Sequence, residues 1–140
     1  MPDKPAYFSD PGAVAACATD TPRKVPGLAD LHRMTALLLA EAAPTAADML
    51  VVGAGGGLEL AAMAAFESRW RFVGVDPSPA MLDLARQVVA PFSERVRLIT
   101  GTVDQAPAGP FDGGTCLLTL HFLAHAERLR TLREVRHRLR

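Results

Sequence analysis

One short stretch constrains the fold of this chain more than any other. Residues 49–60 read MLVVGAGGGLEL, an apolar run followed by glycines at positions 53, 55, 56 and 57 and then by helix-forming residues. The pattern predicts a buried strand that turns into a helix through a loop with almost no side chains. Such a turn lets a ligand approach the backbone and directs the N–H groups of a helix N-terminus at an anionic group. It indicates a site for a nucleotide-like molecule; a tight glycine turn without a ligand is the alternative.

The spacing of these glycines separates two types of nucleotide site. The dinucleotide fingerprint G-x-G-x-x-G requires a third glycine at the position where this sequence has Leu58. The sequence instead has G-x-G-x-G, through Gly53, Gly55 and Gly57. A nicotinamide-dependent dehydrogenase is therefore disfavoured.

A second motif follows about twenty residues later, in RFVGVDPSPAMLDLAR at residues 71–86. The apolar residues 72–75 predict a buried strand that ends at Asp76, and Ser78 followed by Pro79 predicts the start of a helix. In a doubly wound sheet, the end of the second strand lies beside the glycine loop of the first. The Asp76 carboxylate could there accept hydrogen bonds from the two hydroxyls of a ribose; a turn acid before a proline is the alternative.

With both motifs in view, the chain resembles the class I S-adenosylmethionine-dependent methyltransferases over residues 25–140, with VVGAGGG as the first motif and VGVDPSPAMLDLAR as the second. The resemblance implies that the three spaced glycines line the methionine part of S-adenosylmethionine and that Asp76 holds its ribose. Many members carry an acid two residues before the first glycine, where this chain has Val51. No metal site is implied, and the implied cofactor-binding residues are Gly53, Ala54, Gly55, Gly57, Asp76, Pro77, Met81, Thr102, Val103 and Leu120.

The adenine end of the cofactor should lie near a third strand, RVRLIT at residues 95–100. In the family, the residues just after this strand flank the adenine ring. By position these are Thr102 and Val103, where many relatives have an acid and a small residue. Asp104, two positions later, is an alternative contact for the adenine amino group.

The apolar run GTCLLTL at residues 114–120 predicts a fourth strand, covered on both faces. His121 follows at its carboxyl end, which in the family overlooks the methyl group and the substrate. We therefore expect His121 to orient an acceptor or to act as a general base, and a structural hydrogen-bonding role is the alternative. His125 is a weaker candidate for the same task.

These elements predict an α/β fold with a doubly wound, mainly parallel sheet, Rossmann-like as in the methyltransferases. Strands at 49–53, 71–75, 96–100 and 114–120 should have the spatial order 3-2-1-4. The resembled fold has seven strands, so we expect either a methyltransferase domain truncated after about four strands or a homo-oligomer. In the homo-oligomer, a second chain would cover the open, apolar fourth strand or the apolar face of the helix at residues 127–140.

The flanking segments carry less information. Residues 1–24 lack a clear period and predict a mobile arm with at most one short helical turn, whose Tyr7 could lie across the cofactor mouth; residues 25–140 form the expected binding domain. Residues 28–43 predict a helix with an apolar face of Leu28, Leu31, Met34 and Leu38. Residues 127–140, with six arginines, predict a basic amphipathic helix with an apolar stripe of Leu129, Leu132, Val135 and Leu139.

Composition limits the possible functions. Fifteen basic and fifteen acidic residues give no overall attraction to nucleic acid or to a membrane surface, and no signal peptide or membrane-spanning run is evident. We expect a cytoplasmic protein with two reduced thiols, Cys17 and Cys116. The favoured function is methyl transfer from S-adenosylmethionine to a small molecule. A cofactor-binding or regulatory module without turnover and, less favoured, a tRNA-modifying enzyme remain alternatives.

Overall fold

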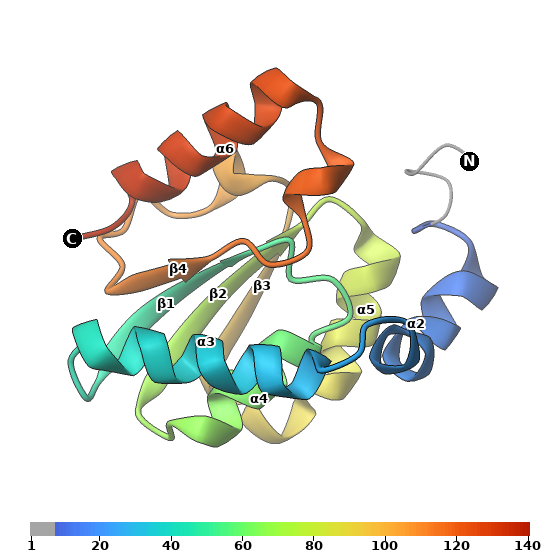
Figure 1. The fold of residues 1–140 in the computed structure, drawn as a ribbon, viewed down its shortest axis with the longest axis horizontal. Helices are drawn as coiled ribbons and strands as arrows, with labels where there is room; N and C mark the ends of the chain where they lie inside the picture. Colours follow the sequence, from blue (N-terminus) through green and yellow to red (C-terminus); the bar gives the residue numbers. More distant parts are fainter. Residues whose placement is uncertain (1–7) are drawn as a thin grey trace.

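A computed structural model describes residues 8–140 and has a four-stranded, all-parallel sheet. The strands are β1 (Ala47–Val52), β2 (Trp70–Asp76), β3 (Val96–Thr100) and β4 (Gly113–Thr115). Their spatial order is β3-β2-β1-β4, which confirms the predicted fold class and strand order (Figure 1).

Helices cover both faces of this sheet (Figure 1). One face carries α3 (Leu28–Ala42), α4 (Leu58–Phe66) and α5 (Pro79–Val88), and the other carries α6 (His125–His137). The helix α2 (Pro11–Lys24) precedes α3 in the chain. Three short 3-10 helices complete the fold: η1 (Ala90–Arg95), η2 (Val103–Gln105) and η3 (Leu120–Phe122). None of the helices in residues 8–140 is both long and apolar enough to cross a membrane.

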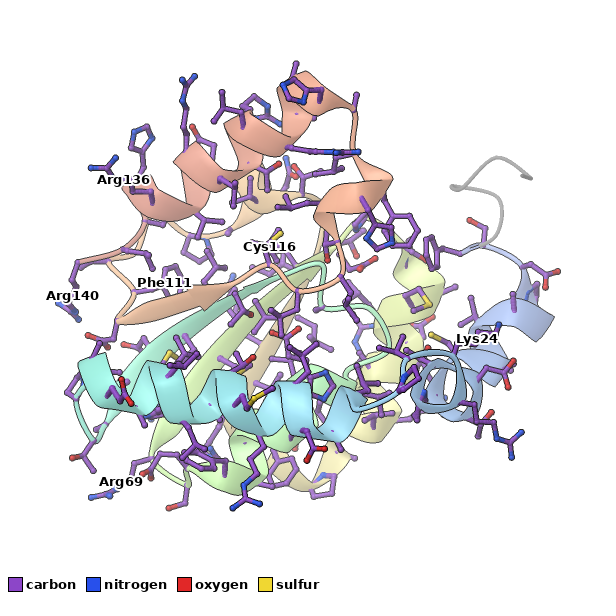
Figure 2. The ribbon with its side chains drawn as sticks, in the orientation of Figure 1. Lys24, Arg69, Phe111, Cys116, Arg136 and Arg140 are labelled. Atoms are coloured by element: carbon purple, nitrogen blue, oxygen red, sulfur yellow. The ribbon has the colours of Figure 1, made fainter. Side chains whose placement is uncertain are left out.

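The strand β1 supplies alternate residues to two apolar cores. Met49 and Val51 pack with α3, α4 and α5, whereas Leu50 and Val52 pack with α6. Phe111 and Cys116 lie on the α6 side of the sheet, as Figure 2 shows. Burial of β1 on both faces explains why its sequence is a continuous apolar run.

Residues 11–24 differ from the expected arm, because they form the 14-residue helix α2. The Asp10 carboxylate caps this helix by accepting a hydrogen bond from Ala13 N at 2.8 Å, and Pro11 occupies the first turn. Val14 is buried, so tertiary packing completes a helix that its weak periodicity did not reveal. Tyr7 lies outside the described residues.

The expected apolar faces of two helices were also partly wrong. In α3 the buried residues are Leu28, His32 and Ala36, while Met34 and Leu38 are 55% and 66% exposed. Because both faces of α3 carry apolar residues, periodicity alone could not select the buried one. In α6, Thr131 and Val135 are buried, whereas the predicted stripe residues Leu129 and Leu132 are 49% and 45% exposed.

The fourth strand is much shorter than its apolar sequence predicted. Regular pairing with β1 ends at Thr115, and the chain then turns into η3. Leu118 adopts a φ of 51°, and the Thr119 hydroxyl donates to the carbonyl oxygen of Leu117 at 2.9 Å, so local bonds replace the ladder. The long apolar edge expected to pair with a second chain is therefore absent. The homo-oligomer stays a prediction, with the exposed Leu129 and Leu132 of α6 as its other possible contact.

Candidate functional site

A cavity of about 790 Å³ lies at the carboxyl ends of the strands. Its walls come from the loops that follow β1, β2, β3 and β4, together with parts of α2, α3, α4, α5 and α6. This is the side of a doubly wound sheet where ligands bind. Nine of the ten predicted cofactor-binding residues line it: Gly53, Ala54, Gly55, Gly57, Asp76, Pro77, Met81, Thr102 and Val103. Leu120 does not, because β4 ends at Thr115 and Leu120 begins η3.

The glycine loop takes its shape from three left-handed residues. Gly53, Gly55 and Gly57 have φ values of 76°, 50° and 86°, a region that L side chains rarely adopt. A Cβ at Gly57 would lie 2.9 Å from the Cα of Ala85, so this glycine allows α4 to pack closely on α5. A Cβ at Gly55 would meet only ordinary contacts, the nearest being Met81 Cε at 3.6 Å. The open space at Gly55 is thus part of the cavity.

The carboxylate of Asp76 is fixed beside this loop. One oxygen accepts a hydrogen bond from Gly55 N at 2.9 Å, and the other accepts one from Ser78 N at 2.9 Å. Burial raises the pKa of Asp76, while these two hydrogen bonds act in the opposite direction. A carboxylate can accept about four hydrogen bonds, so both oxygens retain capacity for donors of a ligand.

The residues after β3 form a third part of the wall. Thr102 caps η2, and Val103 is buried. Asp104, the alternative adenine contact, does not line the cavity. Its two oxygens instead accept hydrogen bonds from Arg130 Nη1 and Nη2, at 2.8 and 2.9 Å. Asp104 therefore pairs with an arginine of α6 and lies outside the wall that Thr102 and Val103 line.

The predicted catalytic candidate, His121, lies in η3 at the cavity wall. Its ring packs on Phe122, with the ring centroids 4.0 Å apart. Phe122 in turn makes an edge-to-face contact with Phe8 at 5.2 Å, and the Ser78 hydroxyl donates to the carbonyl oxygen of Phe8 at 2.7 Å. Phe8 and Ser9, just before α2, thus form part of the cavity wall. His125 lies outside the cavity wall.

Sequence reasoning missed two buried ionisable residues in the wall, Glu59 and His32. The Glu59 carboxyl accepts a short hydrogen bond from the Thr115 hydroxyl. Burial raises the pKa of Glu59 to about 7 and lowers the pKa of His32. A glutamate in the first turn of a helix is common because it complements the helix dipole, so Glu59 gave no signal in the sequence.

A comparison with protein families decides the class of this site. A family model described as a methyltransferase domain matches residues 49–140, about two thirds of the chain. The chain belongs to this methyltransferase domain family. The matched part of the methyltransferase domain begins in β1 and contains the glycine loop, Asp76 and the residues after β3.

Solved structures agree with this family. The methyltransferase domain is 30% identical to CalS10, a SAM-bound amino pentose methyltransferase from Micromonospora echinaspora, with a TM-score of 0.69 over 88% of this chain and 50% of that protein. A candidate O-methyltransferase from Nostoc punctiforme PCC 73102 shares the fold, with 22% identity and a TM-score of 0.73 over 91% of this chain and 37% of the other. The chain thus spans half or less of these two proteins. Among functionally curated proteins, none matches it significantly.

Proposed function

We propose that this chain binds S-adenosylmethionine in the cavity and supports transfer of its methyl group to a small molecule. The observation that carries the proposal is the Asp76 carboxylate, held by Gly55 N beside an open glycine loop at the carboxyl ends of β1 and β2. CalS10, which shares the fold, was solved with SAM bound.

The residues present fit the chemical groups of this cofactor. The free acceptor positions of Asp76 suit the two ribose hydroxyls, and the apolar side chain of Val103 suits one face of an adenine ring. The glycine loop leaves room for the amino acid part, because no side chain occupies the space at Gly55. When bound, the cofactor supplies a methyl group on a sulfonium, which is a good leaving group. The chain must then mainly bind and align the two reactants.

The remaining cavity wall favours a small acceptor with apolar surface. Leu28, Leu118 and Phe122 contribute large apolar side chains to it. CalS10 is an amino pentose methyltransferase, and an O-methyltransferase family 2 protein from Planctomyces limnophilus with a similar fold was solved in complex with apigenin. His121 in this wall is the proposed residue to orient the acceptor or to receive its proton.

The arginines of the last helix give little support to an RNA acceptor. Arg130, Arg138 and Arg140 form ion pairs with Asp104, Glu134 and Asp112. Arg136 and Arg140 lie near the start of β4, at the opposite end of the sheet from the cavity (Figure 2). A small molecule is therefore the better proposal.

Calorimetric titration with S-adenosylhomocysteine tests the cofactor assignment. We expect micromolar affinity for this ligand and no binding of NAD. Asp76→Asn keeps the shape but loses the charge, and it should weaken binding by roughly 10-fold or more, since a hydrogen bond to a charged group contributes about 1.5–3 kcal/mol. Asp104→Asn is the matched control, because Asp104 lies outside the cavity wall, and it should bind like the wild type.

Binding of NAD instead of S-adenosylhomocysteine, or equal affinities in the wild type and Asp76→Asn, would contradict the assignment. Formation of S-adenosylhomocysteine from S-adenosylmethionine with an acceptor separates an enzyme from a binding module without turnover. Cytoplasmic location and a homo-oligomeric state also stay predictions, and light scattering after size exclusion tests the second.

A further inference from the structure

Glu59 is an unusual residue to find in the wall of this cavity. Its side chain is nearly inaccessible, with 7% exposure of the residue, and the Thr115 hydroxyl is its hydrogen-bond donor. Within residues 8–140, Glu59 forms no ion pair with a lysine, arginine or histidine. A buried carboxylate without a cation is costly, and the molecule keeps one here at the edge of a ligand cavity.

The other two carboxylates of the wall already have N–H partners of the protein. Asp76 accepts hydrogen bonds from two backbone N–H groups, and Glu127 pairs with Arg130 at 3.0 Å. Glu59 has neither a backbone donor nor a charged partner in the described part of the chain. Glu59 is therefore the carboxylate of this wall that is available to form an ion pair with a cationic group of a ligand.

The sheet register shows where this carboxylate lies. Glu59 comes from the first turn of α4, yet it bonds the side chain of Thr115, the residue that pairs with Val51 in the parallel ladder. Residues in register on parallel strands point to the same face, and Val51 faces α4. The carboxyl group of Glu59 thus sits next to Val51, at the end of β1 and beside the glycine loop.

We infer that Glu59 binds the α-ammonium group of the methionine part of the cofactor. This inference rests on the proposed function. S-adenosylhomocysteine carries one cationic group under neutral conditions, the α-ammonium, and the amino acid part that bears it belongs beside the glycine loop. The position two residues before Gly53, where many members of the resembled class have an acid, is Val51 here. Glu59 of α4 thus supplies the carboxylate that β1 lacks at Val51.

The geometry has a consequence for the pH dependence of binding. Glu59 must be ionised to bind an ammonium, and burial raises its pKa to about 7 in the free protein. Binding of the cation lowers that pKa, so affinity rises with pH through this range and a proton is released. The other ionisable side chains of the cavity wall in this region are Cys17 on α2, His32 on α3 and Asp76 at the end of β2. Cys116, which follows β4 on the α6 side of the sheet, lies outside the wall, and burial together with the charge of Glu59 raises its pKa to about 11.

The experiment compares two ligands that differ at the amino acid end. S-adenosylhomocysteine has the α-ammonium, and 5′-methylthioadenosine lacks the whole amino acid part. We expect Glu59→Gln to weaken S-adenosylhomocysteine by roughly 10- to 100-fold and methylthioadenosine by less than about 3-fold. Glu67→Gln, at the exposed end of the same helix, is the control and should change neither affinity. Equal weakening of both ligands by Glu59→Gln, or of neither, overturns the inference and leaves the proposed function intact.

Proton release by the wild type provides a second readout if Glu59→Gln does not fold. Calorimetry at pH 7 in buffers of different ionisation enthalpy should show release of about half a proton with S-adenosylhomocysteine and none with methylthioadenosine. The same release with both ligands, or with neither, overturns the inference. In a folded Glu59→Gln variant the release should disappear, whereas a contribution from His32 would persist. Failure of the wild type to bind either nucleoside overturns the proposed function and this inference with it.

Discussion

The segment from β1 to α5 and the segment after β4 both border the cavity, and both are rich in apolar residues, yet their backbones are fixed in different ways. In the first, glycines at positive φ, the Ser78 cap and two buried strands fix each turn. In the second, residues 116–122 leave the sheet after three paired residues and form a loop and a 3-10 turn. Apolar composition alone does not make a strand, because a strand also needs a partner along its whole length.

The two segments also have different roles in the proposed site. The first segment supplies the fixed groups of the proposed cofactor site, namely the glycine loop and Asp76. The second supplies Leu118, His121 and Phe122 to the part of the wall assigned to the acceptor. Recognition of one constant cofactor suits a rigid region, and recognition of varied acceptors suits a loop.

The largest expected change in the free energy of unfolding is for a substitution at Gly57, in the first segment. Gly57→Ala places a Cβ 2.9 Å from the Cα of Ala85 at a φ of 86°, so strain and overpacking add. We expect the free energy of unfolding to fall by roughly 2–5 kcal/mol, as measured by urea denaturation. Gly27→Ala is the matched control, because its φ is 75° but its Cβ would meet nothing within 4 Å, and it should cost only about 1 kcal/mol. Equal losses would show that packing of α4 on α5 is not what fixes the loop.

The next effect concerns Glu59, which connects the first segment to the end of β4. Its pKa is raised to about 7 in the folded chain from an ordinary value of 4.5, so the folded state binds this proton more tightly than the unfolded state. The resulting stabilisation is present below pH 4.5 and is lost as the pH rises through about 7. We expect the ligand-free wild type to lose up to about 3 kcal/mol of stability over this range relative to Glu59→Gln, measured by urea denaturation at several pH values. Parallel pH profiles of the two proteins would contradict the burial of this carboxyl group.

The smallest effect is expected in the segment after β4. Leu118 has a φ of 51° and is 46% exposed. The substitution Leu118→Gly relieves backbone strain in the folded state, but it removes some packing and raises the conformational entropy of the unfolded chain. We expect the free energy of unfolding to change by less than about 1 kcal/mol. Leu60→Ala, at a fully buried leucine of the first segment, should cost roughly 2–5 kcal/mol. Similar losses for both variants would show that the two segments are equally fixed.

The same contrast explains what could be predicted from the sequence. The strand-glycine-helix turn, Asp76 at the end of β2 and the Ser78 cap are set by local signals, and the structure has all of them where they were expected. The end of β4 depends on how far β1 extends beside it, which no local pattern reports. Leu120, which the resemblance implies in the cofactor site, lies beyond the end of that strand, in η3.

Other features could not be predicted because they depend on packing between residues far apart in the sequence. Met34 and Ala36 are both apolar and both on α3, and only the complete fold shows that Ala36 is the buried one. Glu59 was missed for a similar reason, because its partner Thr115 lies 56 residues away in sequence. Asp104 was considered as an adenine contact, but its pairing with Arg130 of α6 required the fold to be known.

A crystal structure of this chain with S-adenosylhomocysteine tests the central claim most directly. The account predicts that the ligand occupies the cavity at the carboxyl ends of the strands, with its ribose hydroxyls donating to Asp76 while Gly55 N still donates to the same carboxylate. Its amino acid end should lie along the glycine loop. A ligand bound elsewhere, or one whose ribose makes no contact with Asp76, would contradict the account.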